Sequence, residues 1–324
     1  MPPILQIENL STHFETARGT VKAVDGVDLC VNEGDTLGIA GESGCGKTVL
    51  ALSVMRLVPR PPGRIVSGRI LFEGEDLLAF PEEEMRRIRG KRISMIFQEP
   101  MSSLNPVFRI GDQVAETLRL HEGLSSAEAH HRAVEMLRLV GIPAPETRAR
   151  DYPHQMSGGM RQRVMIAMAL SCRPRLMLAD EPTTALDVTI QAQILELIQG
   201  LKREVGTSVV LITHDLGVIA EAAQAAAVMY AGWVVEQGPV ERIFSSPLHP
   251  YTVGLMNSIP RIGRRPAGNG YLNVIPGTIP DLLELPSGCK FRDRCDRAMP
   301  ICAEKKPALL EKTPGHSVRC WLHA

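Results

Sequence analysis

The chain has 324 residues, of which 44% are hydrophobic, and this length suits about two globular domains. Its 36 basic and 36 acidic residues cancel, which argues against a protein that holds nucleic acid or an anionic bilayer through a general positive field. The N-terminus has no secretory-signal pattern, and the most apolar stretch, residues 220–235, is too short and too interrupted to span a membrane. We therefore expect a cytosolic protein, whose thiols stay mostly reduced.

Four short segments predict the strands of the fold. Residues 21–31 alternate between apolar and polar side chains, which is typical of a half-exposed strand. Residues 36–41, 175–180 and 208–213 are continuous apolar runs, which indicate strands buried on both faces. Helical patterns separate these runs, so the sequence predicts an α/β fold with a mostly parallel sheet.

The segment "GESGCGKT" at residues 41–48 fits the phosphate-binding pattern G-x-x-x-x-G-K-[ST], with a buried strand before it and a helical stretch after it. Backbone N–H groups of such a loop face phosphates, and the helix N-terminus adds partial positive charge. Lys47 is expected to reach the β- and γ-phosphates of a nucleotide, and the Thr48 hydroxyl to bind Mg²⁺. The loop residues expected around the phosphates are Gly41, Ser43, Gly44, Cys45 and Gly46. For the Cys45 side chain we favour a space-filling role over that of a reactive thiol.

Residues 110–140 carry apolar positions at helical spacing around a "GLSS" break and have no strand signal. They predict an inserted helical subdomain, at about residues 100–170. From Pro239 onward the periodicity weakens and prolines accumulate. We therefore expect a nucleotide-binding domain at 1–240 and a small Cys/Pro-rich extension at 241–324.

A second polar group follows the apolar strand of "RLMLADEP". Asp180 is placed to hold Mg²⁺ through water, and Glu181 to polarise the water that attacks the γ-phosphorus. An ordinary strand-terminal turn is the alternative. In "QMSGGMRQR", Ser157, Gly158 and Gly159 open a helix, so that a hydroxyl, backbone N–H groups and the helix dipole point at one anion. Without a wider context, this pattern indicates only a capped helix.

With these motifs in this order, residues 1 to about 260 resemble the ATP-binding subunits of ATP-binding-cassette transporters. The resemblance implies a P-loop ATPase core with a mostly parallel sheet, an antiparallel β-subdomain and an inserted helical subdomain. "QMSGGMRQR" resembles the family signature, with Met160 where Gln is most common, and the family binds there the γ-phosphate held by the opposite subunit.

Four further residues take their expected roles from the resemblance. Gln98 resembles the glutamine that contacts Mg²⁺ or the attacking water. "TTALD", ending at Asp187, resembles the D-loop. His214 resembles the switch histidine that contacts the γ-phosphate. Phe14 resembles the aromatic residue that stacks on adenine, although a core position is the alternative.

The tail narrows the family. "SSPLHPYTVGLMNSIP", "IPGTIPDLLELPSGCKFRDRC" and "QEPMSSLNP" resemble the dipeptide and oligopeptide importer ATPases. The resemblance implies a second, paralogous ATPase subunit, two transmembrane permease subunits, an extracellular or periplasmic peptide-binding protein, no nucleic acid, and a place on the cytoplasmic face of the membrane. The same machinery could carry nickel, glutathione or another small solute. A non-transporting cassette ATPase acting on nucleic acid or ribosomes is a more distant alternative.

Four cysteines lie in the tail, at Cys289, Cys295, Cys302 and Cys320, in the pattern C-x5-C-x6-C-x17-C. Disulfides are disfavoured in a reduced cytosol, and the spacing is looser than that of common zinc sites. Four thiolates could hold a [4Fe–4S] cluster, which some members of the resembled importers carry, or zinc, or remain unligated. We favour the cluster, in a structural role, with Arg292 or Arg294 offsetting the thiolates. Cys30 and Cys172 are expected to be small buried residues.

Overall fold

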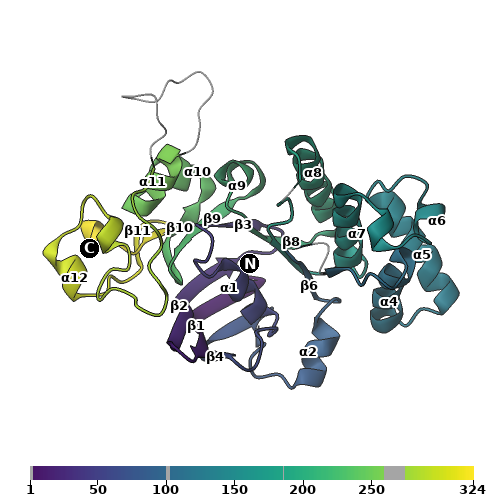
Figure 1. Ribbon diagram of the computed structural model, residues 1–324, viewed down its shortest axis with the longest axis horizontal. Helices are drawn as coiled ribbons and strands as arrows, with labels where there is room; N and C mark the ends of the chain where they lie inside the picture. The colour runs from purple at the N-terminus through teal and green to yellow at the C-terminus, as the bar shows by residue number, and fades with distance from the viewer. Residues whose placement is uncertain (1–2, 100–102, 185, 259–273) are drawn as a thin grey trace. The chain divides into compact units, whose positions relative to one another are not determined.

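The computed structural model describes residues 3–99, 103–184, 186–258 and 274–324 (Figure 1). The chain divides into two compact units that are each discontinuous in sequence. Unit 1 contains residues 1–4, 31–34 and 79–212, and unit 2 contains residues 5–30, 35–78 and 213–324. The phosphate loop and the C-terminal extension therefore share one unit, although they lie far apart in the chain, at residues 41–48 and 241–324.

Unit 2 contains a four-stranded sheet in the order β2-β1-β4-β5. Strand β1 pairs antiparallel with β4, and β4 pairs antiparallel with β5. The bounds are β1 Leu5–Thr16, β2 Gly19–Val31, β4 Gly63–Phe72 and β5 Glu75–Asp76. This sheet is the expected antiparallel β-subdomain.

A second sheet of unit 2 joins the core to the C-terminal extension. Strand β3 pairs parallel with β9, while β10 pairs antiparallel with β9 on one side and with β12 on the other. The strands are β3 Thr36–Ala40, β9 Ala225–Tyr230, β10 Trp233–Pro239, β11 Leu310–Thr313 and β12 His316–Val318. The helices of this unit are α1 Lys47–Val54, α9 Leu216–Ala222, α10 Val240–Ser245, α11 Pro250–Ser258, α12 Pro300–Glu304, η2 Arg292–Arg294 and η3 Trp321–His323.

Unit 1 contains the parallel strands β6, β7 and β8, with β7 in the middle. Every residue of β7 and β8 is buried, as their continuous apolar sequences predict. The bounds in this unit are β6 Ile93–Ile96, β7 Leu176–Asp180, β8 Ser208–Ile212, α2 Glu82–Ile88, α4 Ile110–Glu122, α5 Ser126–Leu139, α6 Pro145–Arg148, η1 Pro153–Gln155, α7 Gly158–Leu170 and α8 Val188–Val205.

The predicted helical insertion is present as two helices joined by a short turn. Helix α4 is followed by the cap residue Gly123, whose φ of 68° suits glycine. Helix α5 is preceded by the cap residue Ser125, which forms a reciprocal capping box with Glu128. The "GLSS" break is therefore a helix stop followed directly by a helix start.

The alternation predicted for residues 21–31 is present in β2 only over residues 27–31, since residues 23 and 24 are both buried, and it corrects one expectation. Residues 27, 29 and 31 are buried while residues 28 and 30 are exposed, so Cys30 faces outward rather than into the core. Cys172 is buried, as expected.

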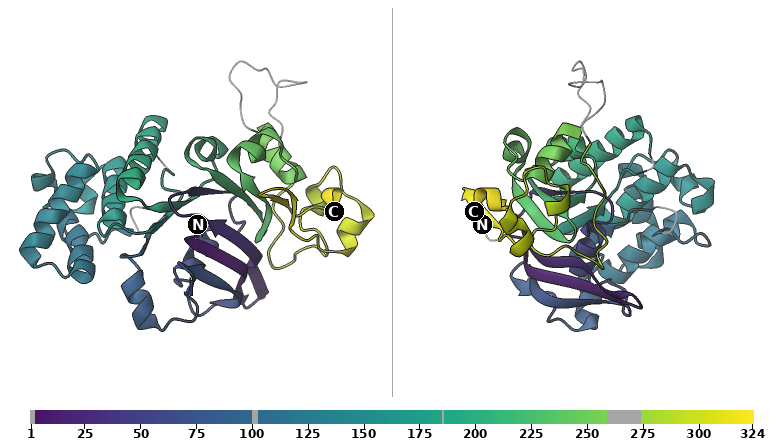
Figure 2. Two further views of the ribbon diagram at one scale, coloured as in Figure 1. Left: turned by 180° about the vertical axis from the view of Figure 1, so that it is seen from behind. Right: turned by 60° about the vertical axis from the view of Figure 1, so that its left-hand side comes forward.

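The C-terminal extension is built onto the core of unit 2. Cys289, Phe291 and Cys302 belong to the same buried apolar cluster as Tyr230 and Trp233 of β9 and β10. Both views of Figure 2 show this yellow segment beside the green β9–β10 end of the sheet. Although the tail has little apolar sequence of its own, it gains a core by sharing one. In the part of the chain that the structure describes, no helix has the length and apolar character needed to cross a bilayer.

Candidate functional site

The phosphate loop is shaped by its glycines, two of which leave no room for a side chain. Gly46 has a φ of 106°, and a Cβ there would lie 2.1 Å from the carbonyl oxygen of Ala23. Gly41 has a φ of 150°, and its Cβ would lie 2.3 Å from the carbonyl oxygen of Met229. Gly44 also has a positive φ, of 80°, but a Cβ there would meet nothing within 4 Å. Close packing on the strands therefore fixes the two ends of the loop, while its middle stays open.

Lys47 begins α1 directly after the loop and is 5% exposed. Its Nζ donates hydrogen bonds to the carbonyl oxygens of Gly41 at 2.7 Å and Glu42 at 3.1 Å. The Cys45 thiol is fully buried, and this burial raises its pKa. A raised pKa disfavours the reactive thiolate and supports the space-filling role.

The remaining predicted residues of unit 2 lie at or near the surface. Ser43 and Thr48 are exposed, on the loop and in the first turn of α1. The Phe14 ring is half-buried on β1, opposite Gly63 of β4, and does not belong to the apolar core. His214 is exposed and follows the end of β8. These side chains are accessible to a ligand.

In unit 1, four predicted or neighbouring polar groups lie at the carboxyl end of β7. Asp180, 1% exposed, ends the strand. The next residue, Glu181, has a φ of 47°, an uncommon value for a side-chain-bearing residue and one that often marks a functional site. Its Oε2 accepts hydrogen bonds from Gln98 Nε2 at 3.2 Å and from Thr184 Oγ1 at 2.8 Å. The Glu181 carboxylate is therefore oriented from two sides.

Two helix starts in unit 1 carry the other predicted residues. Ser157 caps α7, since its Oγ accepts from the backbone N–H of Met160 at 3.3 Å. Asp187 caps α8 by accepting from the N–H of Ile190 at 3.0 Å. Gly158 and Gly159 form the first turn of α7, which contains no acidic residue. This helix end therefore presents backbone N–H groups and partial positive charge to an anion.

Comparisons with known proteins decide the family. Residues 24–184 match the ABC transporter family model, and residues 235–302 match the model of the oligopeptide/dipeptide transporter C-terminal region. A probable peptide ABC transporter ATP-binding protein of Sinorhizobium fredii is 54% identical over 98% of this chain and 94% of its own length. The oligopeptide transport protein OppD of Bacillus subtilis is 51% identical over 98% of this chain and 88% of its own length.

The chain belongs to the ABC transporter ATP-binding family. Among solved structures, the dimeric ATP-binding cassette MJ0796 in a post-hydrolysis state with ADP and Pi superimposes with a TM-score of 0.66. That cassette is 28% identical, and the match covers 73% of this chain and 98% of the cassette. The resemblance in fold and family that the motifs predict is thus confirmed, and the chain is an ABC ATPase.

The four tail cysteines of this ABC ATPase are near one another but are not drawn into a metal site. All seven cysteines lie in described segments and are free thiols. Burial, followed by the charges of Cys302, Cys320 and Cys295, raises the pKa of Cys289 to about 11. Within the described residues, no three His, Cys, Asp or Glu side chains are arranged to hold a metal ion. Four cysteine thiols are therefore suitable ligands for a thiolate-bound metal centre, but their positions in this structure do not form a metal-binding geometry.

The tail also corrects one prediction and reveals residues that sequence patterns missed. Arg294 does not face the cysteines. Its guanidinium forms an ion pair with Glu42 of the phosphate loop, 2.7 Å between Nη1 and Oε2. Glu42 occupies an unrestricted position of the loop motif, and 252 residues separate it from Arg294. No local sequence signal could have indicated this contact.

Proposed function

We propose that this chain is the ATP-hydrolysing subunit of a membrane importer for dipeptides or oligopeptides. One observation carries the proposal: the segment that matches the oligopeptide/dipeptide transporter C-terminal region lies in the same compact unit as the phosphate loop. The relatives OppD and DppD of Bacillus subtilis, an oligopeptide and a dipeptide transport ATP-binding protein, support the same cargo class.

ATP would be held by the loop of unit 2. The N–H groups of residues 41–46 face the phosphates, Lys47 reaches the β- and γ-phosphates, and Phe14 stacks on adenine. The buried Lys47 and the half-buried, non-core Phe14 support these roles. Thr48, Asp180 and Gln98 would hold Mg²⁺, which neutralises phosphate charge during transfer.

Glu181 would act as the general base that polarises the attacking water. The hydrogen bonds from Gln98 and Thr184 support this role because they hold the carboxylate in a fixed orientation at the end of β7. His214 would contact the γ-phosphate from its exposed position after β8. Hydrolysis then needs nothing from the protein beyond positioning, proton acceptance and charge stabilisation.

A complete site would need a second subunit. The chain has one phosphate loop and one "SGGM" segment, and Ser157, Gly158, Gly159 and Asp187 would act on the nucleotide of the partner. The dimeric form of the related cassette supports this pairing. We propose that the partner is a paralogous ATPase.

The permease subunits would dock on the helical part of unit 1. A pocket of about 770 Å³ there is lined by residues that include Phe108, Asp112 and Leu120. Phe108 is 54% exposed and Leu120 is 75% exposed, which is unusual for large apolar side chains and suits a contact with another protein. The chain would then lie on the cytoplasmic face of the membrane, with a peptide-binding protein on the outer side.

Reconstitution tests the function. The chain, its paralogue and the permeases encoded beside it, placed in liposomes with their binding protein, should hydrolyse ATP faster when peptide is added. Glu181→Gln should lower this rate by about 10²–10⁴-fold while ATP binding persists. Stimulation by nickel or glutathione but not by peptide would contradict the cargo class, and fast, concentration-independent hydrolysis by the single chain would contradict the pairing.

We also propose that the four tail cysteines bind a [4Fe–4S] cluster that orders the tail. The proximity of the cysteines supports this, since the charges of neighbouring cysteines act on Cys289, Cys295 and Cys320, and four thiolates are the usual ligand set of such a cluster. Anaerobically purified protein should be brown, with absorbance near ~400 nm that Cys295→Ser removes. Stoichiometric zinc would contradict the cluster, and four titratable thiols would contradict any metal.

A further inference from the structure

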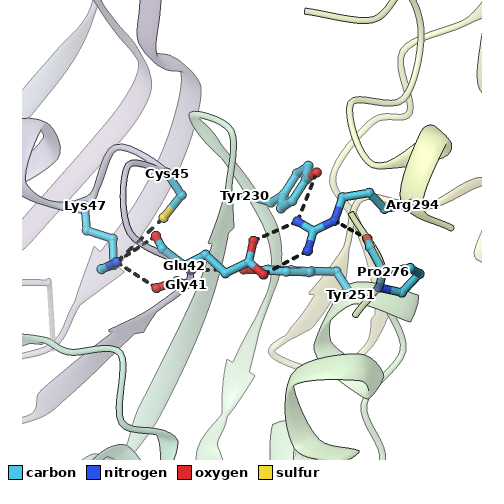
Figure 3. A network of polar contacts seen from close by, with 8 residues as sticks. All are labelled: Gly41, Glu42, Cys45, Lys47, Tyr230, Tyr251, Pro276 and Arg294. Carbon is cyan, nitrogen blue, oxygen red and sulfur yellow. Dashed lines mark hydrogen bonds and ion pairs between the residues drawn. The ribbon is translucent and has the colours of Figure 1, made fainter. Parts of the chain in front are cut away.

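The C-terminal extension holds the phosphate loop at one residue, Glu42, from two sides (Figure 3). The Arg294 guanidinium donates to both carboxylate oxygens of Glu42, with Nη1 2.7 Å from Oε2 and Nη2 2.9 Å from Oε1. The backbone N–H of Glu42 donates to the Tyr251 hydroxyl at 3.0 Å. Arg294 lies in η2 and Tyr251 in α11, so both contacts come from the extension.

Contacts other than the ion pair with Glu42 also hold the Arg294 side chain in place. Its Nε donates to the carbonyl oxygen of Pro276 at 2.9 Å, and its guanidinium lies 5.6 Å from the ring centre of Tyr230 and 5.9 Å from that of Phe291. The Arg294 side chain is only 6% exposed. A fixed, two-pronged, largely buried ion pair loses less side-chain entropy and is less screened than a surface pair.

Tyr251 is equally fixed. Its side chain is fully buried, and its ring packs edge-on against Tyr230, with 4.7 Å between ring centres. Phe291 lies 5.4 Å from the same ring. The Tyr251 hydroxyl oxygen is therefore held at a fixed position, where it accepts the hydrogen bond from the Glu42 N–H. A buried tyrosine commonly packs through its ring and forms a hydrogen bond through its hydroxyl.

Glu42 connects these contacts to the lysine of the loop. Lys47 Nζ donates to the carbonyl oxygen of Glu42, so one residue touches the extension through its carboxylate and N–H and touches Lys47 through its carbonyl. A carboxylate in a phosphate loop repels an incoming polyanion unless it is neutralised and turned away. Arg294 does both.

We propose that Arg294 and Tyr251 are positioning residues for nucleotide binding, through which the C-terminal extension sets the affinity of the phosphate loop for ATP. This inference rests on the proposed role of the loop and of Lys47. It gives the extension an effect on the energy-supplying step, in addition to any part it has in assembly.

Equilibrium titration of the purified full-length chain with Mg-ATP and Mg-ADP tests the inference. Arg294→Gln should weaken both by about tenfold, which corresponds to about 1.4 kcal/mol. Tyr251→Phe keeps the ring and loses the acceptor, so we expect a two- to fivefold loss. Adding Glu42→Gln to Arg294→Gln should recover most of the affinity, because the unpaired carboxylate is then removed.

Two variants make the outcome unambiguous. Arg292→Gln is the matched control, since Arg292 donates to Ser287 and Ala303 within the extension and not to the loop, and its affinity should stay within twofold. Lys47→Ala tests the loop itself. If Lys47→Ala binds normally, the loop assignment and this inference both fail. If only Lys47→Ala weakens binding, or if Arg292→Gln weakens it as much as Arg294→Gln, this inference alone fails. Should Arg294→Gln not fold, Arg294→Lys should show an intermediate loss, and Tyr251→Phe remains decisive.

Discussion

The phosphate loop and the C-terminal extension belong to one compact unit but obtain their shapes in different ways. The loop is shaped by its own backbone, because Gly41 and Gly46 hold positive φ angles and pack against strand carbonyls. The extension has short elements and is held by buried polar contacts with the core, such as Glu236 of β10 with His316 of β12, 2.8 Å apart. Local geometry can be recognised in a sequence motif, whereas contacts of this second kind cannot.

The largest expected effect comes from changing the shape of the loop. Gly46→Ala places a Cβ 2.1 Å from the carbonyl oxygen of Ala23 at a φ of 106°. We expect this change to weaken the affinity for nucleotide by about 100-fold or more. Gly44→Ala is the matched control, since its φ is also positive but its Cβ would meet nothing within 4 Å. Titration with a fluorescent ATP analogue measures both. Equal losses in the two variants would show that positive φ, and not close packing, controls the loop.

The next effect comes from the buried carboxylate that anchors the extension. Glu236 is fully buried and accepts from the N–H groups of Leu248 and His249 in addition to its contact with His316. Glu236→Ala leaves three groups without this acceptor and should lower the free energy of unfolding by about 3 kcal/mol in denaturant titration. Glu311→Ala, which removes an exposed carboxylate on β11, should change it by less than ~0.5 kcal/mol. If the two variants lose similar amounts of unfolding free energy, the buried contacts of Glu236 are not what holds the extension.

Acidification should weaken the same region. Burial, aided by the charge of His323, lowers the pKa of His249 to about 3 from an ordinary 6.5. Between these values the unfolded chain binds a proton that the folded chain does not, so stability falls as pH drops below 6.5, by about 1.4 kcal/mol per unit. His249→Asn keeps an acceptor for the Tyr251 N–H but does not titrate. Between pH 7 and pH 5, the unfolding free energy of this variant should fall less steeply than that of the unchanged protein, by the contribution of one proton, about 1.4 kcal/mol per pH unit. An equal slope in the two proteins would exclude His249 as the cause of the acid sensitivity.

The smallest effect should come from the surface contact of the extension. Arg18, after β1, lies 3.6 Å from Asp281 of the extension, and both side chains are more than half exposed. Such pairs contribute roughly 0–1 kcal/mol, so Arg18→Gln should change the unfolding free energy by less than ~0.5 kcal/mol. A loss of ~2 kcal/mol or more would show that surface charge, rather than buried contacts, holds the extension.

The sequence by itself determined the parts of this protein that depend on neighbouring residues. The buried strands 36–41, 175–180 and 208–213, the helices around "GLSS" and the glycines of residues 41–48 could all be predicted, because hydrophobic periodicity and φ preferences act over a few residues. The family followed from the order of such motifs. The outward-facing Cys30 could also have been predicted, because it lies at a polar-face position of the alternating segment 21–31.

Only the tertiary structure decided how the extension is held and what it touches. Arg294 stands beside Cys295 in sequence but binds Glu42, and Tyr251 meets the same residue across 209 positions of the chain. The hydrogen bond from Gln98 to Glu181, 83 residues apart, likewise depends on how separate segments meet. Such pairings are specified by the packing of a whole core. The stretches around Glu42 and Arg294 therefore carry no periodicity or turn preference that records which distant partner each will find.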